Sequence, residues 1–221
     1  MSKFLSEFVA LDGFDGIYIA SRDQLRCTAI RLSTGGVCLF SPVEGLGDEA
    51  LASLTDLGKV EILIAPNHYH NKGLKEYAKA FPKALICASE SAGIRLKNVT
   101  GLQFKDIDKL RSRLLSNMKL LQPAGLKTGE VWISIRGIKS HSWLVVDSFC
   151  GSIENSKTKI AKPDILKTFP KFGVADRVVY LEWLKRQIEK DSPTTIIPCH
   201  GGVINSQKLT STIWRLVNAK L

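Results

Sequence analysis

The chain has 221 residues, of which 44% are hydrophobic and 24% are charged, and its formal net charge is +10. That length can bury a core, and the chain has no run of about 18 apolar residues, which argues against a membrane-spanning helix. The first residues lack the basic and apolar regions of a secretory signal, so we expect a cytoplasmic location. The chain has no low-complexity linker, which favours one domain over residues 1–221. A basic surface attracts anionic partners, but no nucleic-acid-binding motif accompanies the charge.

The first 90 residues alternate between strand-like and helix-like patterns. Short runs of β-branched and apolar residues predict strands at 16–20, 26–32, 37–41, 60–65 and 84–88. Apolar side chains at helical spacing predict helices at 48–57 and 74–81, and a polar loop at 66–73 precedes the second helix. Gly58 and Pro82 are typical of residues that end helices. This alternation predicts helices packed on a sheet.

The second half repeats this alternation. Apolar runs predict strands at residues 131–135, 143–147 and 194–198. The predicted helix at 174–190 has one apolar face, formed by Val174, Val178, Leu181, Leu184 and Ile188. A final amphipathic helix contains Ile213, Leu216 and Val217, whereas residues 148–173 show no strong periodicity. The repetition predicts two similar halves that pack face to face.

All four histidines and one acid lie at the edges of predicted strands. His68 and His70 follow one apolar strand, His141 precedes another, Asp147 ends that strand, and His200 follows a third. Sites in sheets covered by helices gather at strand ends, where loops converge. Imidazole and carboxylate groups bind zinc, iron or manganese. Each histidine could equally be a solvated loop residue, and the acid could cap a turn.

The five cysteines are odd in number and widely spaced, with no Cys-x-x-Cys pair. This spacing excludes zinc ribbons and thioredoxin-type motifs, and a cytoplasmic location favours reduced thiols. Cys150 and Cys199 adjoin the predicted site, so either thiolate is a candidate soft ligand, the alternative being an inert buried thiol.

Together these segments resemble the metallo-β-lactamase-like hydrolases. Members of that superfamily have a His-x-His-x-Asp-His loop after an apolar strand, then a lone histidine, an acid at a strand end and a final histidine before glycine. The corresponding segments here are residues 64–74, His141, residues 144–147 and residues 198–202. Pro66-Asn67, His70 and residues 81–84 resemble more closely the divergent DUF4336 branch. Over residues 10–205, the resemblance implies an α/β (α+β) fold, a four-layer αββα sandwich.

The first motif departs from the family pattern in either of two registers. In one register, its four positions are His68, His70, Lys72 and Gly73. In the other, they are Ala65, Asn67, Tyr69 and His70, which fits the Pro-Asn pair and the start of the helix better. Both registers lack the acid that binds one metal ion in the family and orients the attacking water, and Lys72 opposes cation binding.

The remaining ligand set implied by the resemblance is His70, Asp147 and His200, with His68 and His141 as further candidates. Only five residues separate His141 from Asp147, fewer than in the typical family layout. Three protein ligands and a water are sufficient for one catalytic zinc ion. The lysine-rich stretch 157–171 is either a binding surface for an anionic small molecule or an exposed connection.

Three hypotheses follow. The first is a metal-dependent hydrolase with a reduced, mononuclear site that uses one divalent ion, zinc or else iron or manganese. The second is a metal-free, non-catalytic descendant of the fold with a binding or structural role. The third is a nucleic-acid-binding protein or nuclease, which the charge permits but no motif supports. The sequence leaves the substrate and the oligomeric state open.

Overall fold

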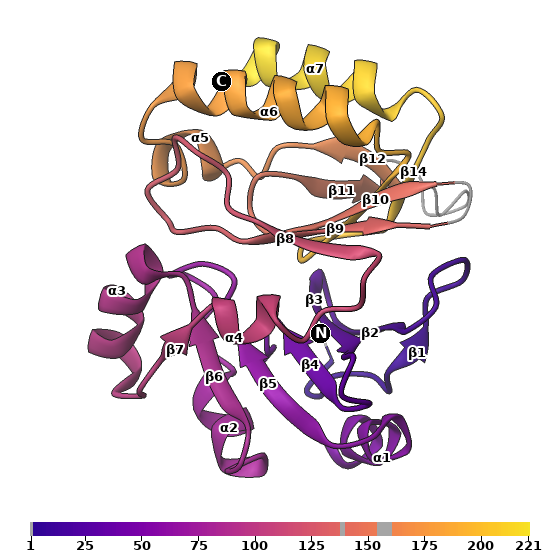
Figure 1. Cartoon of the computed structure of the whole chain (residues 1–221), viewed down its shortest axis with the longest axis vertical. Coiled ribbons are helices and arrows are strands. Elements are labelled where there is room, and N and C mark those ends of the chain that lie inside the picture. Colours follow the sequence, from indigo (N-terminus) through magenta and orange to yellow (C-terminus); the bar gives the residue numbers. More distant parts are fainter. Residues whose placement is uncertain (1, 138–139, 154–160) are drawn as a thin grey trace. The chain divides into compact units, whose positions relative to one another are not determined.

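A computed structural model describes residues 2–137, 140–153 and 161–221. The chain divides into two compact units, an N-terminal unit, Met1–Ser116, and a C-terminal unit, Asn117–Leu221. Each unit contains a β-sheet that carries helices (Figure 1). The prediction of one domain over residues 1–221 stays a prediction. Within the described ranges, every helix is too short or too polar to cross a membrane.

The main sheet of the N-terminal unit has its strands in chain order, β1-β2-β3-β4-β5-β6-β7. They are β1 (Val9–Ala10), β2 (Ile17–Arg22), β3 (Leu25–Arg31), β4 (Val37–Phe40), β5 (Val60–Ile64), β6 (Leu85–Ala88) and β7 (Lys105–Asp106). The pairs from β1 to β4 are antiparallel, whereas β4 to β7 are parallel. The carboxyl ends of β4 and β5 therefore lie at one edge, and the loops that follow them meet there.

Helices pack on this sheet through apolar side chains. They are α1 (Asp48–Leu57), α2 (Leu74–Ala80), α3 (Glu90–Thr100) and the short α4 (Asp108–Arg111). Leu54 of α1 and Tyr77 of α2 join one buried cluster with Leu39 and Leu63 of the sheet. Leu96 of α3 belongs to a second buried cluster. The predicted strands and helices of this half are confirmed, while α3, β7 and α4 were not predicted.

The main sheet of the C-terminal unit has the strand order β14-β13-β10-β9-β8. Its strands are β8 (Met118–Leu121), β9 (Trp132–Arg136), β10 (His141–Val145), β13 (Thr195–Pro198) and β14 (Ile204–Asn205). Two further strands, β11 (Cys150–Ile153) and β12 (Ala161–Asp164), pair with each other. Strands β10 and β13 are parallel neighbours, so their carboxyl ends lie side by side at the same edge. Those two ends carry Asp147 and His200.

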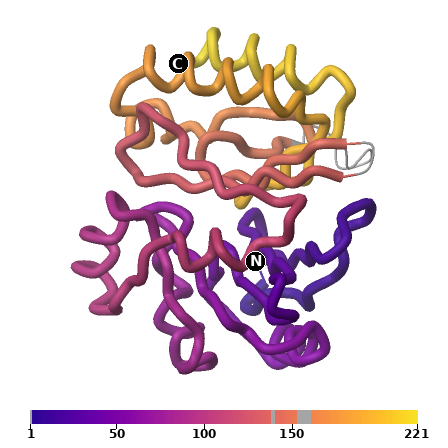
Figure 2. The backbone as a smooth tube through the Cα atoms, viewed as in Figure 1, coloured from indigo at the N-terminus to yellow at the C-terminus, as the bar shows by residue number. Residues whose placement is uncertain are grey.

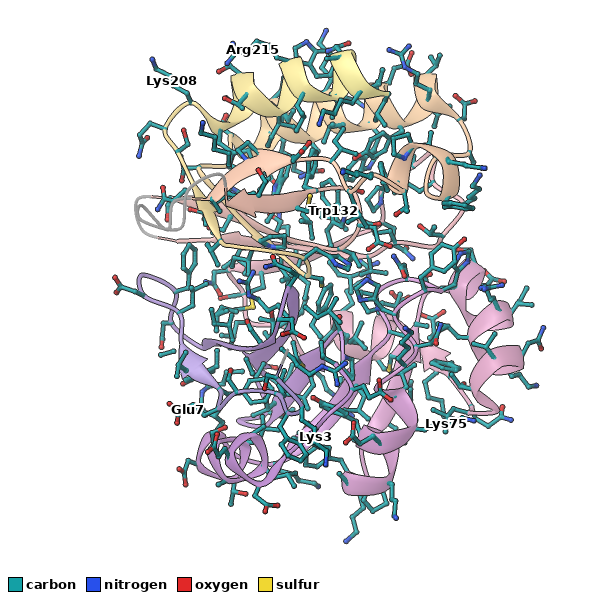
Figure 3. The ribbon with its side chains drawn as sticks, turned by 180° about the vertical axis from the view of Figure 1, so that it is seen from behind. Lys3, Glu7, Lys75, Trp132, Lys208 and Arg215 are labelled. Atoms are coloured by element: carbon teal, nitrogen blue, oxygen red, sulfur yellow. The ribbon has the colours of Figure 1, made fainter. Side chains whose placement is uncertain are left out.

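The described residues of this unit form three helices: α5 (Phe169–Phe172), α6 (Arg177–Asp191) and α7 (Leu209–Lys220). Helices α6 and α7 run beside each other over the sheet (Figures 1 and 2). Trp132 of β9 is fully buried, and its ring lies 5.3 Å from the rings of Trp143 and Trp183. Figure 3 shows Trp132 inside this unit, while Lys208 and Arg215 project from its outer surface.

The predicted helix at 174–190 was partly wrong. Helix α6 begins at Arg177, because the Asp176 side chain accepts a hydrogen bond from the Val179 amide at 3.0 Å and caps the first turn. Val178, assigned to the buried face, is 62% exposed. The buried positions are instead Tyr180, Leu184, Gln187 and Asp191. Polar side chains with hydrogen-bond partners thus replace part of the expected apolar stripe.

Residues 148–173 contain more structure than their sequence pattern predicted. Strands β11 and β12 and helix α5 lie in this segment. Of its lysines, Lys162, Lys167 and Lys171 are exposed. Lys157 and Lys159, which belong to the predicted lysine-rich surface, lie outside the described residues.

Candidate functional site

In the N-terminal unit, the loop after β5 is shaped by a buried asparagine. Asn67 is 0% exposed, and its Oδ1 accepts hydrogen bonds from the Tyr69 amide at 2.8 Å and the His70 amide at 3.1 Å. A side-chain oxygen that binds amides two and three residues ahead forms a local turn. Asn67 therefore fixes the backbone that presents His70. His68 lies beside it, with its ring edge-on to Tyr69.

His70 is oriented by the loop after the neighbouring parallel strand. Its Nδ1 lies 2.7 Å from Oγ of Ser41, which follows β4 and is 1% exposed. A hydroxyl can accept the Nδ1 hydrogen of a neutral imidazole, which fixes the tautomer whose Nε2 carries a lone pair. This arrangement suits a metal ligand, because metal-binding histidines usually donate their other ring hydrogen to an oxygen.

Gly73 lies just before α2, where the backbone packs closely against another segment of the chain. A Cβ atom at this position would overlap with the carbonyl of Pro42. Leu74, the next residue, is fully buried. Gly73 thus marks a close packing of two backbone segments at the start of this helix. Lys72, just before it, is exposed.

In the C-terminal unit, Asp147 and His200 come together because their strands are paired in register. Val145 of β10 pairs with Pro198 of β13, and each candidate residue follows two positions later. The Nε2 atom of His200 lies 3.0 Å from Oδ1 of Asp147. Their side chains are 20% and 11% exposed, so the pair is partly shielded from water.

Backbone hydrogen bonds of Gly151 and Gly202 hold the His200 loop against β11. The Gly151 amide donates to the His200 carbonyl at 2.9 Å, and the Gly202 amide donates to the Gly151 carbonyl at 3.1 Å. A Cβ atom on Gly201 would overlap with the carbonyl oxygen of Gly151, and Gly201 has φ +81°. Gly201 is therefore required by close backbone contact and by a left-handed conformation.

Replacing Gly201 with alanine is expected to lower the free energy of unfolding by at least about 2 kcal/mol, because overlap adds to backbone strain. Chemical denaturation monitored by circular dichroism measures the change. Gly35→Ala is the matched control, since Gly35 has φ +83° but open space around its Cβ position. Equal losses for Gly201→Ala and Gly35→Ala would contradict the overlap.

Glu130, which the sequence did not single out, lies beneath Asp147. It is 2% exposed and accepts hydrogen bonds from the Trp132 indole at 2.7 Å and the Ser148 hydroxyl at 2.7 Å. Burial, followed by the charge of Asp147, raises the pKa of Glu130 to about 7. A single acid before a strand is normally exposed, so no sequence signal indicated this position.

His141 has a different environment from the other candidates. It starts β10, so Asp147 lies six residues farther along nearly extended chain, about 20 Å away. Its Nε2 is 2.6 Å from Ser134 Oγ and 3.5 Å from Asp191 Oδ2. That Asp191 oxygen also accepts hydrogen bonds from Ser134 and Trp143. These contacts join the sheet to the end of α6, and we assign His141 this structural role.

His141 gives a pH prediction. Burial lowers its pKa, outweighing the raising effect of Asp191, while Arg136 and Lys119 lower it further. Because the unfolded chain then binds a proton more readily than the folded chain, stability falls as pH drops through the unfolded pKa near 6.5. Unfolding free energies at pH 7.5 and 5.5 should differ less in His141→Gln than in the wild type. An unchanged difference would contradict the assignment.

None of the five cysteines forms a disulfide, and all of them lie in the described residues. Cys199 is 1% exposed. Burial raises the pKa of Cys150 to about 11, which keeps this thiol protonated near neutral pH. The expectation of inert thiols is therefore favoured for Cys150 over a role as a metal ligand.

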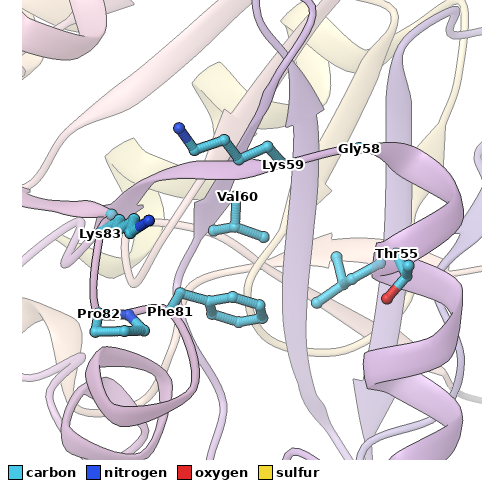
Figure 4. A pocket seen from close by; sticks show the side chains of 9 residues that line it. Thr55, Gly58, Lys59, Val60, Phe81, Pro82 and Lys83 are labelled. Carbon is cyan, nitrogen blue, oxygen red and sulfur yellow. The ribbon is translucent and has the colours of Figure 1, made fainter.

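A surface pocket of the N-terminal unit lies away from His70. Its volume is about 530 Å³, and Val60, Phe81 and Ala84 contribute apolar walls (Figure 4). Val60 starts β5 and Ala84 precedes β6, so the pocket lies at the amino ends of these strands. His70 follows the carboxyl end of β5, at the opposite edge. The pocket therefore offers no place for a substrate beside that histidine.

Solved structures match this chain over nearly its whole length, although no protein-family model and no curated protein sequence matches it. The metallo-β-lactamase from Pontibacter korlensis has a TM-score of 0.64 and 13% identity, covering 97% of this chain and 99% of that one. The metallo-β-lactamase FIM-1 from Pseudomonas aeruginosa, in its mono-zinc form, has a TM-score of 0.65 and 12% identity, covering 99% and 97%. The chain has the metallo-β-lactamase fold. The fold class predicted from the sequence is thereby confirmed.

The residues of this metallo-β-lactamase-fold chain fit a metal ion chemically. His70, Asp147 and His200 offer imidazole nitrogens and carboxylate oxygens, the ligands that zinc accepts. Two ligand atoms at 2.0–2.1 Å from a tetrahedral ion are about 3.3 Å apart. The 3.0 Å between His200 Nε2 and Asp147 Oδ1 is close to that separation. This pair lies in the C-terminal unit, whereas His70 and His68 lie in the N-terminal unit.

Proposed function

We propose that this protein is a metal-dependent hydrolase with one divalent ion bound by His70, Asp147 and His200. The observation that carries the proposal is the Asp147–His200 pair, whose facing ligand atoms are 3.0 Å apart at the carboxyl ends of two parallel strands. When bound, the ion would supply a Lewis acid that activates water for hydrolysis. Zinc suits two imidazoles and a carboxylate best, with iron and manganese as alternatives.

The chain's own residues prepare these ligands. Nδ1 of His70 lies 2.7 Å from Oγ of Ser41, so Nε2 is the ring nitrogen that would bind the ion. The Asp147 side chain offers a carboxylate oxygen, a ligand for divalent ions, in a place that is only 11% exposed. His200 is held by the backbone contacts of its loop with Gly151. His68 and His141 are left out of the ligand set.

The reduced first motif supports one ion rather than two. In the register that contains Pro66-Asn67, the Asn67 side chain occupies a position where the family places a metal ligand. Its Oδ1 accepts two backbone amides and so forms a turn instead. Lys72 adds a positive charge to the same loop, which disfavours a second cation.

The finer assignments belong to the same proposal. The Pro66-Asn67 and His70 pattern favours the DUF4336 branch of the superfamily. The net charge of +10 favours a small anionic substrate. The exposed side chains of Lys162, Lys167 and Lys171 are candidates for attracting it.

Metal analysis of protein purified without chelator tests the proposal. We expect about one equivalent of zinc, iron or manganese per chain, or uptake of one equivalent when the metal-stripped protein is titrated. Less than about a tenth of an equivalent, with no uptake on titration, would remove the basis for a metal-dependent activity.

That negative result would favour a second function, a metal-free descendant with a binding or structural role. The observations behind it are Lys72, whose charge opposes cation binding, and the 3.0 Å hydrogen bond between His200 and Asp147. A crystal structure with an ion about 2.0–2.2 Å from these side chains would contradict it.

A further inference from the structure

The buried side chain of Glu130 accepts hydrogen bonds from four donors around the turn at Asp147. Oε1 of Glu130 accepts hydrogen bonds from the Trp132 indole, the Ser148 hydroxyl and the Ser148 amide, the last at 3.2 Å. Oε2 accepts from the Asp147 amide at 3.3 Å. Two of these four donors are consecutive backbone amides that follow β10. The side chain of Glu130 therefore fixes the backbone at the candidate metal ligand.

The carboxylate is the side chain that suits this task. All four neighbouring groups donate hydrogen, and an ionised carboxylate accepts on both oxygens. An amide in place of the carboxylate would keep one acceptor and point an NH₂ group at another donor. Such a change would keep the volume and release part of the turn.

We propose that Glu130 is a positioning residue that holds Asp147 in the orientation needed to bind the metal ion. The inference rests on the proposed function, since it assigns Glu130 a role at the same site. Glu130 is buried and touches neither metal nor substrate, so it acts through the backbone of Asp147 and Ser148. Loss of a group that orients a metal ligand typically weakens metal binding by about 10- to 100-fold.

The experiment compares Glu130→Gln and Glu130→Leu with a matched control, Gln187→Met. Gln187 is also buried in the C-terminal unit, and its Nε2 donates to Asp191 at 2.7 Å, away from the Asp147 turn. The first readout is the zinc dissociation constant, measured by competition with a chromophoric chelator. The second is hydrogen exchange of the Asp147 and Ser148 amides in metal-free protein.

We expect Glu130→Gln to weaken zinc binding about 10- to 100-fold and to speed exchange at both amides, with a larger effect in Glu130→Leu. Gln187→Met should lose stability while keeping wild-type zinc affinity and wild-type exchange at these amides. If Glu130→Leu does not fold, the isosteric glutamine variant alone decides the comparison.

The negative outcomes of this experiment separate the role of Glu130 from the proposed function. Zinc binding by the wild type with unchanged affinity in Glu130→Gln would overturn the role of Glu130 and leave the proposed function standing. Equal losses of affinity in Glu130→Gln and Gln187→Met would also overturn it, because destabilisation alone would then explain both. No zinc binding by the wild type would overturn both proposals.

Discussion

Replacing His200 with alanine is expected to weaken zinc binding at least about 100-fold, because apparent zinc-binding energies of about 10–16 kcal/mol are shared among only a few ligands. Nε2 of His200 lies 3.0 Å from Oδ1 of Asp147, so replacing either residue removes one ligand of the same pair. Asp147→Asn is expected to have a similar effect, since it also removes the negative charge. Competition titration with a chromophoric chelator measures both affinities.

His141→Gln is the control for these ligand variants. His141 starts β10 and contacts Ser134, so its replacement should leave the zinc dissociation constant within about threefold of the wild type. A loss of affinity in His141→Gln as large as that in His200→Ala would show that His141 takes part in metal binding. Wild-type affinity in His200→Ala would exclude the proposed ligand set.

Replacing Trp132 with alanine is expected to lower the free energy of unfolding by about 3–5 kcal/mol. Its fully buried ring contacts Trp143, Phe149 and Trp183, with ring centres 5.3 to 5.8 Å apart. The variant also removes the indole that donates to Glu130. Denaturant unfolding monitored by circular dichroism gives the change.

Trp214→Ala is the matched control for the core variant. Trp214 lies on α7 and is only partly buried, so its loss should cost less than half as much as the loss of Trp132. Equal costs at the two tryptophans would mean that the aromatic cluster contributes no more than ordinary partial burial.

The parts of the fold that could be predicted have strong local signals. Strands β5 and β6 are short apolar runs bounded by glycine or proline, and α1 has leucines at helical spacing before Gly58. The ends of the predicted strands at residues 143–147 and 194–198 likewise placed Asp147 and His200 at strand ends. Their contact follows from the parallel pairing of β10 and β13, which a sequence pattern does not state.

The missed elements have weak or misleading patterns. Helix α3 is capped by Ser89 and ends at Gly101, but Ile94 is 73% exposed, so its apolar residues do not form one face. Strands β11 and β12 contain glycine, serine, lysine, proline and aspartate instead of an apolar run. In α6, the buried positions include Gln187 and Asp191, whose hydrogen bonds replace apolar contacts.

The site was only partly predictable for a physical reason. Histidines are scarce in this chain and therefore easy to notice, whereas Glu130 is one acid among many. What distinguishes Glu130 is its burial beside four donors from Trp132, Asp147 and Ser148, and burial depends on the assembled sheet. The sequence left His141 as a further candidate, and the structure places it at the start of β10, at the end opposite Asp147.

The separation of Asp147 and His200 along the chain has a consequence for protein synthesis. Asp147 precedes its partner by 53 residues, and β13, which carries His200, pairs with the edge of β10. A growing chain therefore exposes that edge of β10, with Asp147 at its end, until the ribosome has released β13. Translation that stops between these strands would yield a chain with an open, aggregation-prone edge and half of the ligand pair.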